Sequence, residues 1–478
     1  MKKHYDHLCI CLLFAATPAL SQPTLIKQPS GKIISTASID SIINNLMDAA
    51  DVTGLNLGII NNNTVAYVKG YGYKNKATGG FNDTATSLYA ASLAKPLFAY
   101  IAMQLVDAGK LNLDKPIYKY LPKPIPQYDD YKDLASDDRW KLITARMCLS
   151  HTTGFPNWRQ LFPPDYKLKI LFTPGAKYFY SGEGLCLLQL VVETITGRRL
   201  EQLAQENIFK PFGMPHSSFL WQPAFEDDYG MGHNMSEDTL AIGRPVKENA
   251  AGSMQTTIAD YTRFMAAVMR KKRLSEKAWN EIFKPQVKIS SKRQFSSLDE
   301  DTTADNDNIQ LGYGLGWGLF TSVFGPAFFK EGHGWGWQHY ALSIPGKKCA
   351  FIIMTNSDNG ESIFKALVEK LTGITIPWYW EGYTPYRPAV KLPADVLRQF
   401  TGEYTGKLTA IVTLVNGILK VESPTVNLAK TNLYAINDHH FFLKIMDTEI
   451  DFVKRADGTI EKAVLDDEGD HYELTKVK

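Results

Sequence analysis

The chain has 478 residues, enough for about three structural units and a large buried core. Its 52 lysines and arginines nearly balance its 50 aspartates and glutamates, giving a formal net charge of +2. This balance provides no long-range field to hold nucleic acid or an anionic membrane, so we exclude nucleic acid as an expected partner. With 44% hydrophobic and 12% aromatic residues, the composition is that of a folded globular protein and is compatible with an enzyme.

Residues 1–21 have the pattern of a signal peptide. Two lysines follow Met1, an apolar run extends from Leu8 to Leu20, and small residues stand at Ala19 and Ser21. We expect cleavage after residue 21, export to the periplasm or the exterior, and no stable membrane span afterwards. An uncleaved membrane anchor is the alternative, but the apolar run is short for a span.

The sequence gives little support for metal or cofactor chemistry. Cys148, Cys186 and Cys349 remain after signal cleavage, an odd and widely spaced set that is not a disulfide framework. Neither a C-x-x-C pair nor an H-E-x-x-H motif occurs. The acidic stretch 299–308 lacks the spacing and the glycine of an EF-hand loop and is interpreted as a solvated loop. We therefore predict no metal and no cofactor.

The predicted elements, taken in chain order, describe an α+β fold. A helix is expected over 36–50, and a hairpin over 55–73 turns at Asn61-Asn62-Asn63. Mostly helical patterns follow, including an apolar helix over 96–107. Three short strands and a helix come last, over 328–330, 338–344, 350–355 and 362–371. Strands from both ends thus form one antiparallel sheet flanked by helices, with a helical block inserted.

A second unit is expected after a connection rich in proline and aromatic residues. We predict a first domain over 22–375, a surface-packed linker over 376–393 and an all-β, barrel-like domain over 394–478. Turns are expected at Asn416-Gly417, Asp457-Gly458 and Glu468-Gly469. Phe441, Phe442 and Phe452 are interpreted as core of that domain, not as a ligand cavity, and no site is assigned there.

The chemistry of the chain is expected at Ser92, which opens the tetrad Ser92-Leu93-Ala94-Lys95. Pro96 cannot donate a helical hydrogen bond, so regular helix begins after Ser92 and leaves the serine at the helix mouth. Lys95 then lies one turn along on the same face. Apolar flanks predict burial of this lysine, which disfavours its ammonium form and makes the amine a possible base for the serine. Alone, such a string is more often a capping serine and a solvated lysine.

The surrounding sequence resembles the serine β-lactamase-related superfamily, which includes class C β-lactamases, penicillin-binding D-alanyl-D-alanine carboxypeptidases and esterases of the same fold. Matching segments run in order over about residues 40–375: Leu88 to Pro96, Leu105 to Pro116, Leu149 to Pro156, Pro174 to Gly182, Pro211 to Pro215, Ala251 to Ser253, Tyr313 to Trp317 and Gly332 to Gly334. The resemblance implies hydrolysis through an acyl-enzyme. It also fits the C-terminal β-domain, since many members carry a small appended one.

The resemblance implies a role for each matching residue. Ser92 would be the acylated nucleophile and Lys95 its proton partner. Tyr180 matches the tyrosine of a Y-x-N motif, and His333 matches the first position of a K/H-x-G motif. By analogy, the backbone N–H groups of Ser92 and Gly336 would form the oxyanion hole. Considered alone, Tyr180 is more often core packing, and a histidine satisfied on an edge strand is the alternative for His333.

Two departures from the family pattern bear on the substrate. Gly182, followed by Glu183, stands where the family commonly has asparagine, whose side chain touches the amide of β-lactam or peptidyl substrates. The third motif ends in Trp335 where glycine is usual, and a ring there would crowd the acyl pocket unless Gly336 takes the small position. The residues assigned to substrate binding are Gly182, Glu183, Gly334 and Trp335.

The sequence therefore predicts an exported serine hydrolase that cleaves an ester or amide in a β-lactam, a D-alanyl peptide or a small ester. Its substrate would be a small molecule or a peptidoglycan-derived one, and the oligomeric state is not predicted. A catalytically silent binding protein of the same fold is the alternative. Gly182 and Trp335 support silence, whereas the retained Ser92, Lys95 and Tyr180 favour activity.

Overall fold

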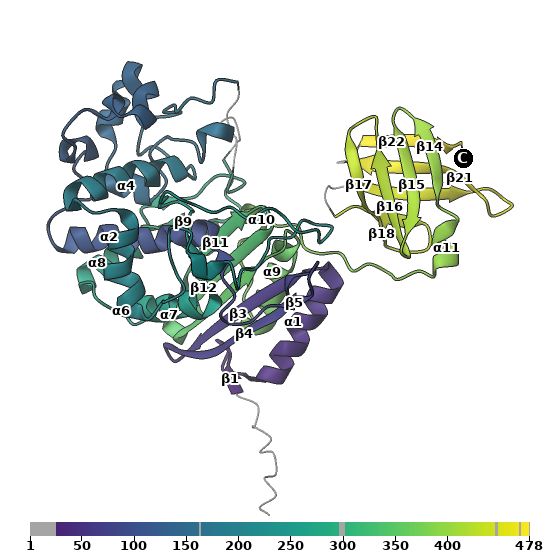
Figure 1. Ribbon diagram of the computed structural model, residues 1–478, viewed down its shortest axis with the longest axis horizontal. Helices are drawn as coiled ribbons and strands as arrows, with labels where there is room; N and C mark the ends of the chain where they lie inside the picture. Colours follow the sequence, from purple (N-terminus) through teal and green to yellow (C-terminus); the bar gives the residue numbers. More distant parts are fainter. Residues whose placement is uncertain (1–24, 162–163, 296–301, 445–447, 468–469, 478) are drawn as a thin grey trace, which may run out of the picture.

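The computed structural model describes residues 25–161, 164–295, 302–444, 448–467 and 470–477. These residues form a first unit in which helices cover both faces of an antiparallel sheet, and a second, all-β unit, joined by an extended segment (Figure 1). The predicted α+β class with a barrel-like C-terminal domain is confirmed. The predicted signal peptide, residues 1–21, lies outside the described residues. Within those residues, no helix has both the length and the apolar character needed to cross a membrane.

In the described part of the first unit, the main sheet has nine strands in the order β5-β4-β3-β13-β12-β11-β10-β9-β8. They are β3 (Gly54–Asn61), β4 (Thr64–Asn75), β5 (Gly80–Phe81), β8 (Val287–Lys288), β9 (Gly312–Tyr313), β10 (Gly318–Ser322), β11 (Gly325–Gly334), β12 (Trp337–Ile344) and β13 (Cys349–Thr355). Early and late strands meet where β3 pairs antiparallel with β13 and Leu57 lies opposite Ile353. The two ends of the domain therefore close one sheet, as predicted.

The predicted N-terminal hairpin is confirmed as β3 and β4. Asn62 and Asn63 between them have φ angles of 53° and 60°, which asparagine tolerates better than most residues. Consecutive positive φ angles match the right-handed twist of the flanking strands. Two minor pairs stand apart from the main sheet: β1 (Leu25–Lys27) with β2 (Ile33–Ser35), and β6 (Leu88–Tyr89) with β7 (Gln255–Thr256).

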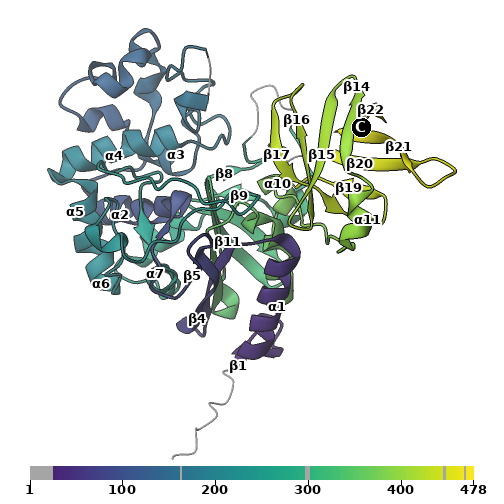
Figure 2. The same ribbon diagram turned by 45° about the vertical axis from the view of Figure 1, so that its right-hand side comes forward.

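Helices cover both faces of the sheet (Figures 1 and 2). The helices α1 (Thr36–Ala50) and α9 (Phe364–Thr372) pack on one face, where Phe351 and Ile353 of β13 contribute to the core. On the other face, Ile352 and Met354 join the core with α2 (Ala94–Asp107) and α7 (Ile258–Met269). The remaining helices are α3 (Ala145–Leu149), α4 (Gly182–Thr196), α5 (Leu200–Ala204), α6 (Lys210–Phe212), α8 (Glu276–Ile282), α10 (Trp378–Glu381) and α11 (Ala394–Arg398). Burial on both faces explains why β13 is apolar throughout.

The segment predicted as a linker, 376–393, is a linker only in its second half. Ile376, Trp380 and Tyr383 are buried in the core that also holds α1 and α9. The aromatic residues of this segment therefore complete the first unit, because burying large rings stabilises the fold more than solvating them. Tyr386 still packs against that core, so the chain leaves it only after this residue.

The second unit is a curved antiparallel sheet in the order β17-β16-β15-β14-β22-β21-β20-β19-β18. Its strands are β14 (Gly402–Gly406), β15 (Thr409–Val415), β16 (Ile418–Ser423), β17 (Leu428–Asn432), β18 (Tyr434–Ala435), β19 (His440–Phe442), β20 (Thr448–Lys454), β21 (Ile460–Asp467) and β22 (Asp470–Lys476). Turns occur as predicted at Asn416-Gly417 and Asp457-Gly458, and the third predicted turn lies outside the described residues. Phe441 and Phe452 are core residues. An ion pair between Lys444 and Asp51 ties this unit to the end of α1.

Candidate active site

Ser92 lies at the mouth of α2, on a short 3-10 turn formed by Ala91–Leu93. Ala91, directly before it, has a φ of 46°, a backbone conformation that costs an L residue of order 1 kcal/mol or more. No side chain caps either the turn or α2. Ser92 is therefore not a capping serine, and its hydroxyl is free for other contacts.

Lys95 contacts that hydroxyl directly. Its Nζ lies 2.7 Å from Ser92 Oγ and donates to the carbonyl oxygen of Ala251 at 2.7 Å. The side chain is 1% exposed. Burial, reinforced by the nearby Lys330 ammonium, lowers the pKa of Lys95 well below its usual value. A neutral amine within hydrogen-bond distance of a serine hydroxyl can accept its proton.

Tyr180 contacts two lysines. The Nζ atoms of Lys95 and Lys330 lie 5.0 Å and 4.9 Å from the centre of its ring. The Lys330 Nζ also donates to Tyr180 Oη at 3.0 Å. Burial, followed by the Glu331 carboxylate, raises the pKa of Tyr180 well above its usual value, although a hydrogen bond with Ser92 opposes this. Tyr180 is therefore a phenol that can relay protons, and Lys95 is the better base.

His151 also packs against Tyr180. Its ring centre lies 4.3 Å from that of Tyr180, and its Nε2 lies 3.2 Å from Tyr313 Oη. The Nδ1 atom contacts the backbone of Ser181, the residue after the tyrosine. Burial and the charges of the two site lysines hold the pKa of His151 well below its usual value. His151 is thus a neutral ring that fixes the position of Tyr180.

Lys330 and Glu331 were not identified from the sequence. Both lie on β11 and are almost completely buried, with Lys330 Nζ 2.5 Å from a Glu331 carboxylate oxygen. Burial lowers the pKa of Lys330, and although burial alone would raise the pKa of Glu331, the Lys330 charge lowers it. The next residue, Gly332, has little room for a side chain, since a Cβ there would lie 3.1 Å from the Ala90 carbonyl oxygen. Lys330 thus lies at Tyr180, and Gly332 lies against the Ala91–Leu93 turn that carries Ser92, called here the nucleophile turn. Together they form a K-x-G pattern.

The position of His333 differs from the prediction. Its Nδ1 lies 2.8 Å from Gln338 Oε1 and 3.3 Å from a Glu361 carboxylate oxygen. Burial alone would lower the pKa of His333, but Glu361 outweighs this and raises it. The side chain that contacts Tyr180 comes from Lys330, three residues earlier on the same strand. His333-Gly334-Trp335 is therefore not the segment that meets the tyrosine.

Gly336 and Trp335 form the two-residue turn between β11 and β12, because Gly334 pairs with Trp337. The Gly336 N–H donates to Asp358 Oδ1 at 2.6 Å, so it is not free to bind an oxyanion as predicted. The Trp335 side chain is 90% exposed and does not crowd the serine. Gly334 and Trp335 instead line a cavity of about 870 Å³ beside the nucleophile turn.

Gly182 cannot hold the asparagine of a Y-x-N motif. A Cβ at Gly182 would lie 2.7 Å from the ring of Trp158 and 3.0 Å from the carbonyl oxygen of Asn157. Glu183, assigned to substrate binding from the sequence, is 4% exposed and forms a two-pronged ion pair with Arg159, at 2.9 Å and 2.7 Å. Glu183 therefore anchors the loop that carries Trp158 and is not available to a substrate.

The family described as Beta-lactamase matches residues 39–371, most of the chain. The chain belongs to the beta-lactamase family. Penicillin-binding protein 4 of Amycolatopsis lactamdurans is 24% identical over 350 residues, which cover 68% of this chain and 86% of the relative. The Bacillus subtilis protein PbpX, named as a penicillin-binding protein, is 26% identical over 263 residues. The match covers 53% of this chain and 64% of that relative, so the chain spans less than two thirds of its length.

Solved structures share the fold with this beta-lactamase family chain at low sequence identity. An octameric penicillin-binding protein homologue from Pyrococcus abyssi has a TM-score of 0.57 and 19% identity, and the match covers 93% of this chain and 100% of that one. The D-alanine carboxypeptidase AmpC of Burkholderia cenocepacia has a TM-score of 0.54 and 18% identity, covering 67% and 93% of the two chains. The first likeness extends over both units, and the second is confined to about two thirds of the chain.

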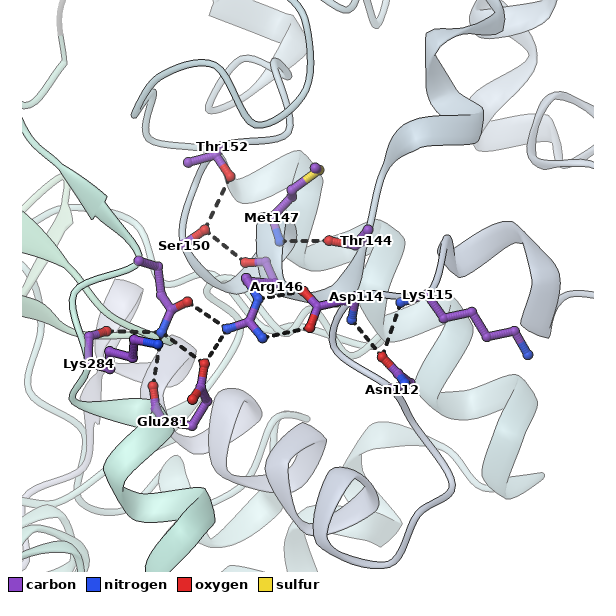
Figure 3. A network of polar contacts seen from close by, with 11 residues as sticks. Asn112, Asp114, Lys115, Thr144, Arg146, Met147, Ser150, Thr152, Glu281 and Lys284 are labelled. Atoms are coloured by element: carbon purple, nitrogen blue, oxygen red, sulfur yellow. Dashed lines mark hydrogen bonds and ion pairs between the residues drawn. The ribbon is translucent and has the colours of Figure 1, made fainter.

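A polar network fixes the loop that carries His151 (Figure 3). Arg146, on α3, forms a two-pronged ion pair with Asp114 at 2.6 Å and 2.8 Å, and a further ion pair with Glu281 of α8. The Arg146 carbonyl oxygen accepts from Ser150 Oγ, which also lies 3.2 Å from Thr152 Oγ1. Ser150 and Thr152 flank His151, so this family motif holds the ring that supports the tyrosine.

Proposed function

We propose that this beta-lactamase family chain is an exported serine hydrolase that forms an acyl-enzyme on Ser92. The observation that carries the proposal is the buried Lys95 Nζ, 2.7 Å from Ser92 Oγ. Because burial and the Lys330 charge lower the pKa of Lys95, they favour its neutral amine, the form that can accept the serine proton. The pairing of a nucleophile with a deprotonated base is what acyl transfer requires.

In acylation, Ser92 Oγ attacks the carbonyl carbon of an ester or amide while Lys95 Nζ takes the hydroxyl proton. The resulting oxyanion accepts hydrogen bonds from the backbone N–H of Ser92 and, in place of Gly336, from that of His333. His333 directly follows the Lys330-Glu331-Gly332 segment, the position the family analogy gives to this donor. Two such donors contribute about 10² to 10³ in rate each.

The leaving oxygen or nitrogen receives a proton from the Lys95 ammonium, either directly or through the Tyr180 hydroxyl. Lys330 keeps Tyr180 oriented by donating to its oxygen at 3.0 Å. In deacylation a water molecule attacks the acyl carbon and gives a proton to Lys95, and the serine oxygen is reprotonated as it leaves. The products are a free acid and the regenerated Ser92 hydroxyl, so atoms and protons balance.

The substrate classes that fit this chemistry are β-lactams, D-alanyl peptides and small esters. The names of the relatives support a cell-wall or antibiotic substrate, since they include penicillin-binding proteins and, in Escherichia coli, a protein named as a D-alanyl-D-alanine carboxypeptidase. Gly182 stands where the family commonly has an asparagine that contacts the substrate amide, and its absence supports a small ester as the substrate. Export is proposed from the signal-peptide pattern of residues 1–21.

A catalytically silent binding protein is the second candidate. It is favoured by two observations: the Trp158 ring occupies the space at Gly182, and the Gly336 N–H is engaged by Asp358. Neither observation touches Ser92, Lys95 or Tyr180, which keep the contacts that acylation needs. We therefore place hydrolysis first.

The test is intact-mass spectrometry of the wild-type protein after separate exposure to a penicillin, a p-nitrophenyl ester and a fluorophosphonate, followed by peptide mapping. We expect a fluorophosphonate adduct and ester turnover, with the adduct mapped to the peptide that contains Ser92. A penicillin adduct on the same peptide would add cell-wall or antibiotic chemistry. Absence of any Ser92 adduct with all three reagents would favour the silent binding protein.

The pH dependence follows from the buried lysine. Lys95 acts as a base only when neutral, so kcat/KM is expected to fall as pH drops below its lowered pKa and to rise toward a plateau above it. The acid limb should lie well below the usual lysine range, and a pH profile of ester hydrolysis measures it. His333→Gln should leave the limb in place, because the His333 side chain does not contact Ser92 or Lys95. If the acid limb of the kcat/KM profile disappears in that variant, the titrating group is His333 and not Lys95.

A further inference from the structure

The cavity near the Ala91–Leu93 turn has aromatic rings in its lining. It has a volume of about 870 Å³, within the range of sites for drug-sized molecules. Five aromatic side chains line it: Tyr89, Trp158, Tyr229, Trp335 and Trp337. The cavity approaches the nucleophile turn at two glycines, since a Cβ on Gly252 would lie 3.8 Å from the Ala91 carbonyl oxygen and one on Gly334 would lie 3.9 Å from Ala91 Cβ. A group bound at these glycines would therefore lie close to Ala91, the residue before Ser92.

Trp158 links the cavity to the acyl side of the site. Its ring lies over Gly182, two residues after Tyr180, and leaves no room there for an amide side chain. The same ring lines the cavity. Replacing a polar contact by an indole surface exchanges hydrogen-bonding capacity for apolar and stacking contact. The acyl portion of a substrate would meet this surface.

The charges around the cavity are already paired. Arg244, the one cation among the lining residues in the described part of the chain, donates to both carboxylate oxygens of Glu226 at 2.7 Å and 2.8 Å. Asp358, which also lines the cavity, accepts from the Gly336 N–H, and burial raises its pKa. A carboxylate brought into this cavity would meet a half-buried acid and an engaged guanidinium. Burying a charge without a partner is strongly unfavourable.

Resting on the proposed function, we propose that the cavity selects an uncharged acyl group bearing an aromatic ring. Stacking and burial against tryptophan and tyrosine rings stabilise such a group. A charged acyl group, such as the peptide portion of a cell-wall stem, would instead lose hydration without gaining a partner. The exposed Trp335 at the tip of the β11–β12 turn forms part of this aromatic lining and offers a ring for the substrate to stack on.

The test compares three p-nitrophenyl esters that share a leaving group: the acetate, the phenylacetate and the carboxylate-bearing hemisuccinate. We expect kcat/KM of the wild-type enzyme to be about tenfold or more higher for the phenylacetate than for the acetate, and lowest for the hemisuccinate. Trp335→Ala should lower kcat/KM for the phenylacetate and leave kcat/KM for the other two esters unchanged. Tyr379→Ala, which removes an exposed aromatic ring that does not line the cavity, is the matched control and should change none.

A second variant tests the charge argument by a gain of activity. Glu226→Gln removes the negative partner of Arg244, so the guanidinium can bind a substrate carboxylate. We expect kcat/KM for the hemisuccinate to rise several-fold and kcat/KM for the two neutral esters to stay unchanged.

A wild-type preference for the hemisuccinate, or a phenylacetate preference unaffected by Trp335→Ala, would overturn the inference while leaving acylation of Ser92 intact. A Ser92 adduct with the penicillin or the fluorophosphonate but with none of the esters would also overturn the inference alone. If no reagent modifies Ser92 in the mass measurement, the proposed function fails and the inference fails with it.

Discussion

Replacing Ser92 with alanine is expected to reduce ester turnover by about 10⁶-fold, as removal of a nucleophile does in other serine hydrolases. Among the residues that the structure describes, the hydrogen-bond partners of the Lys95 amine are Ser92 Oγ and the Ala251 carbonyl oxygen. The covalent adduct seen by mass spectrometry should disappear in the same variant.

The same substitution also tests the structural interpretation of the serine. Because Ser92 caps neither the 3-10 turn nor α2, its replacement should change the free energy of unfolding by less than about 0.5 kcal/mol. Denaturant unfolding measures that change. A loss of about 1 kcal/mol or more, with turnover retained, is the result expected of a capping serine and would contradict the catalytic role.

Local sequence signals predicted much of the fold. The Asn61-Asn62-Asn63 turn, the 36–50 helix and the Asn416-Gly417 turn all depend on residues close in sequence. The extent of β11 did not follow from such signals. We expected a strand over 328–330, whereas β11 runs over Gly325–Gly334, because glycines that weaken strand propensity are required where the strand passes the nucleophile turn.

The candidate site was predictable where one segment supplies two contacting groups. Ser92 and Lys95 lie one helical turn apart, so their contact follows from spacing alone. The third segment was hard to assign because two candidate strings follow one another, Lys330-Glu331-Gly332 and His333-Gly334-Trp335. Only the first ends in glycine, which was a usable signal. The contact between Lys330 Nζ and Tyr180 Oη favours the first string.

The role of Glu183 could not be predicted from the sequence for a different reason. Its partner Arg159 is 24 residues away in sequence and reaches it only because the loop before α4 folds back. A carboxylate beside a catalytic tyrosine suggests substrate binding until its pairing is known. Long-range ion pairs of this kind depend on tertiary packing, which no local pattern encodes.

Replacing Lys330 with methionine is expected to destabilise the protein by about 3–5 kcal/mol, because it leaves the Glu331 carboxylate buried without its cation. It should also reduce acylation by about 10²–10³, since Tyr180 loses the donor that orients its hydroxyl. Denaturant unfolding and the rate of adduct formation measure the two effects separately.

A double variant, Lys330→Met with Glu331→Gln, separates the structural role from the catalytic one. Neutralising both members removes the unpaired charge, so we expect most of the lost stability to return. Acylation should stay as low as in the single variant, because neither protein has the Lys330 ammonium that donates to Tyr180 Oη. If the double variant recovers both stability and acylation, Lys330 serves only to neutralise Glu331, and His333 again becomes the candidate for the third motif.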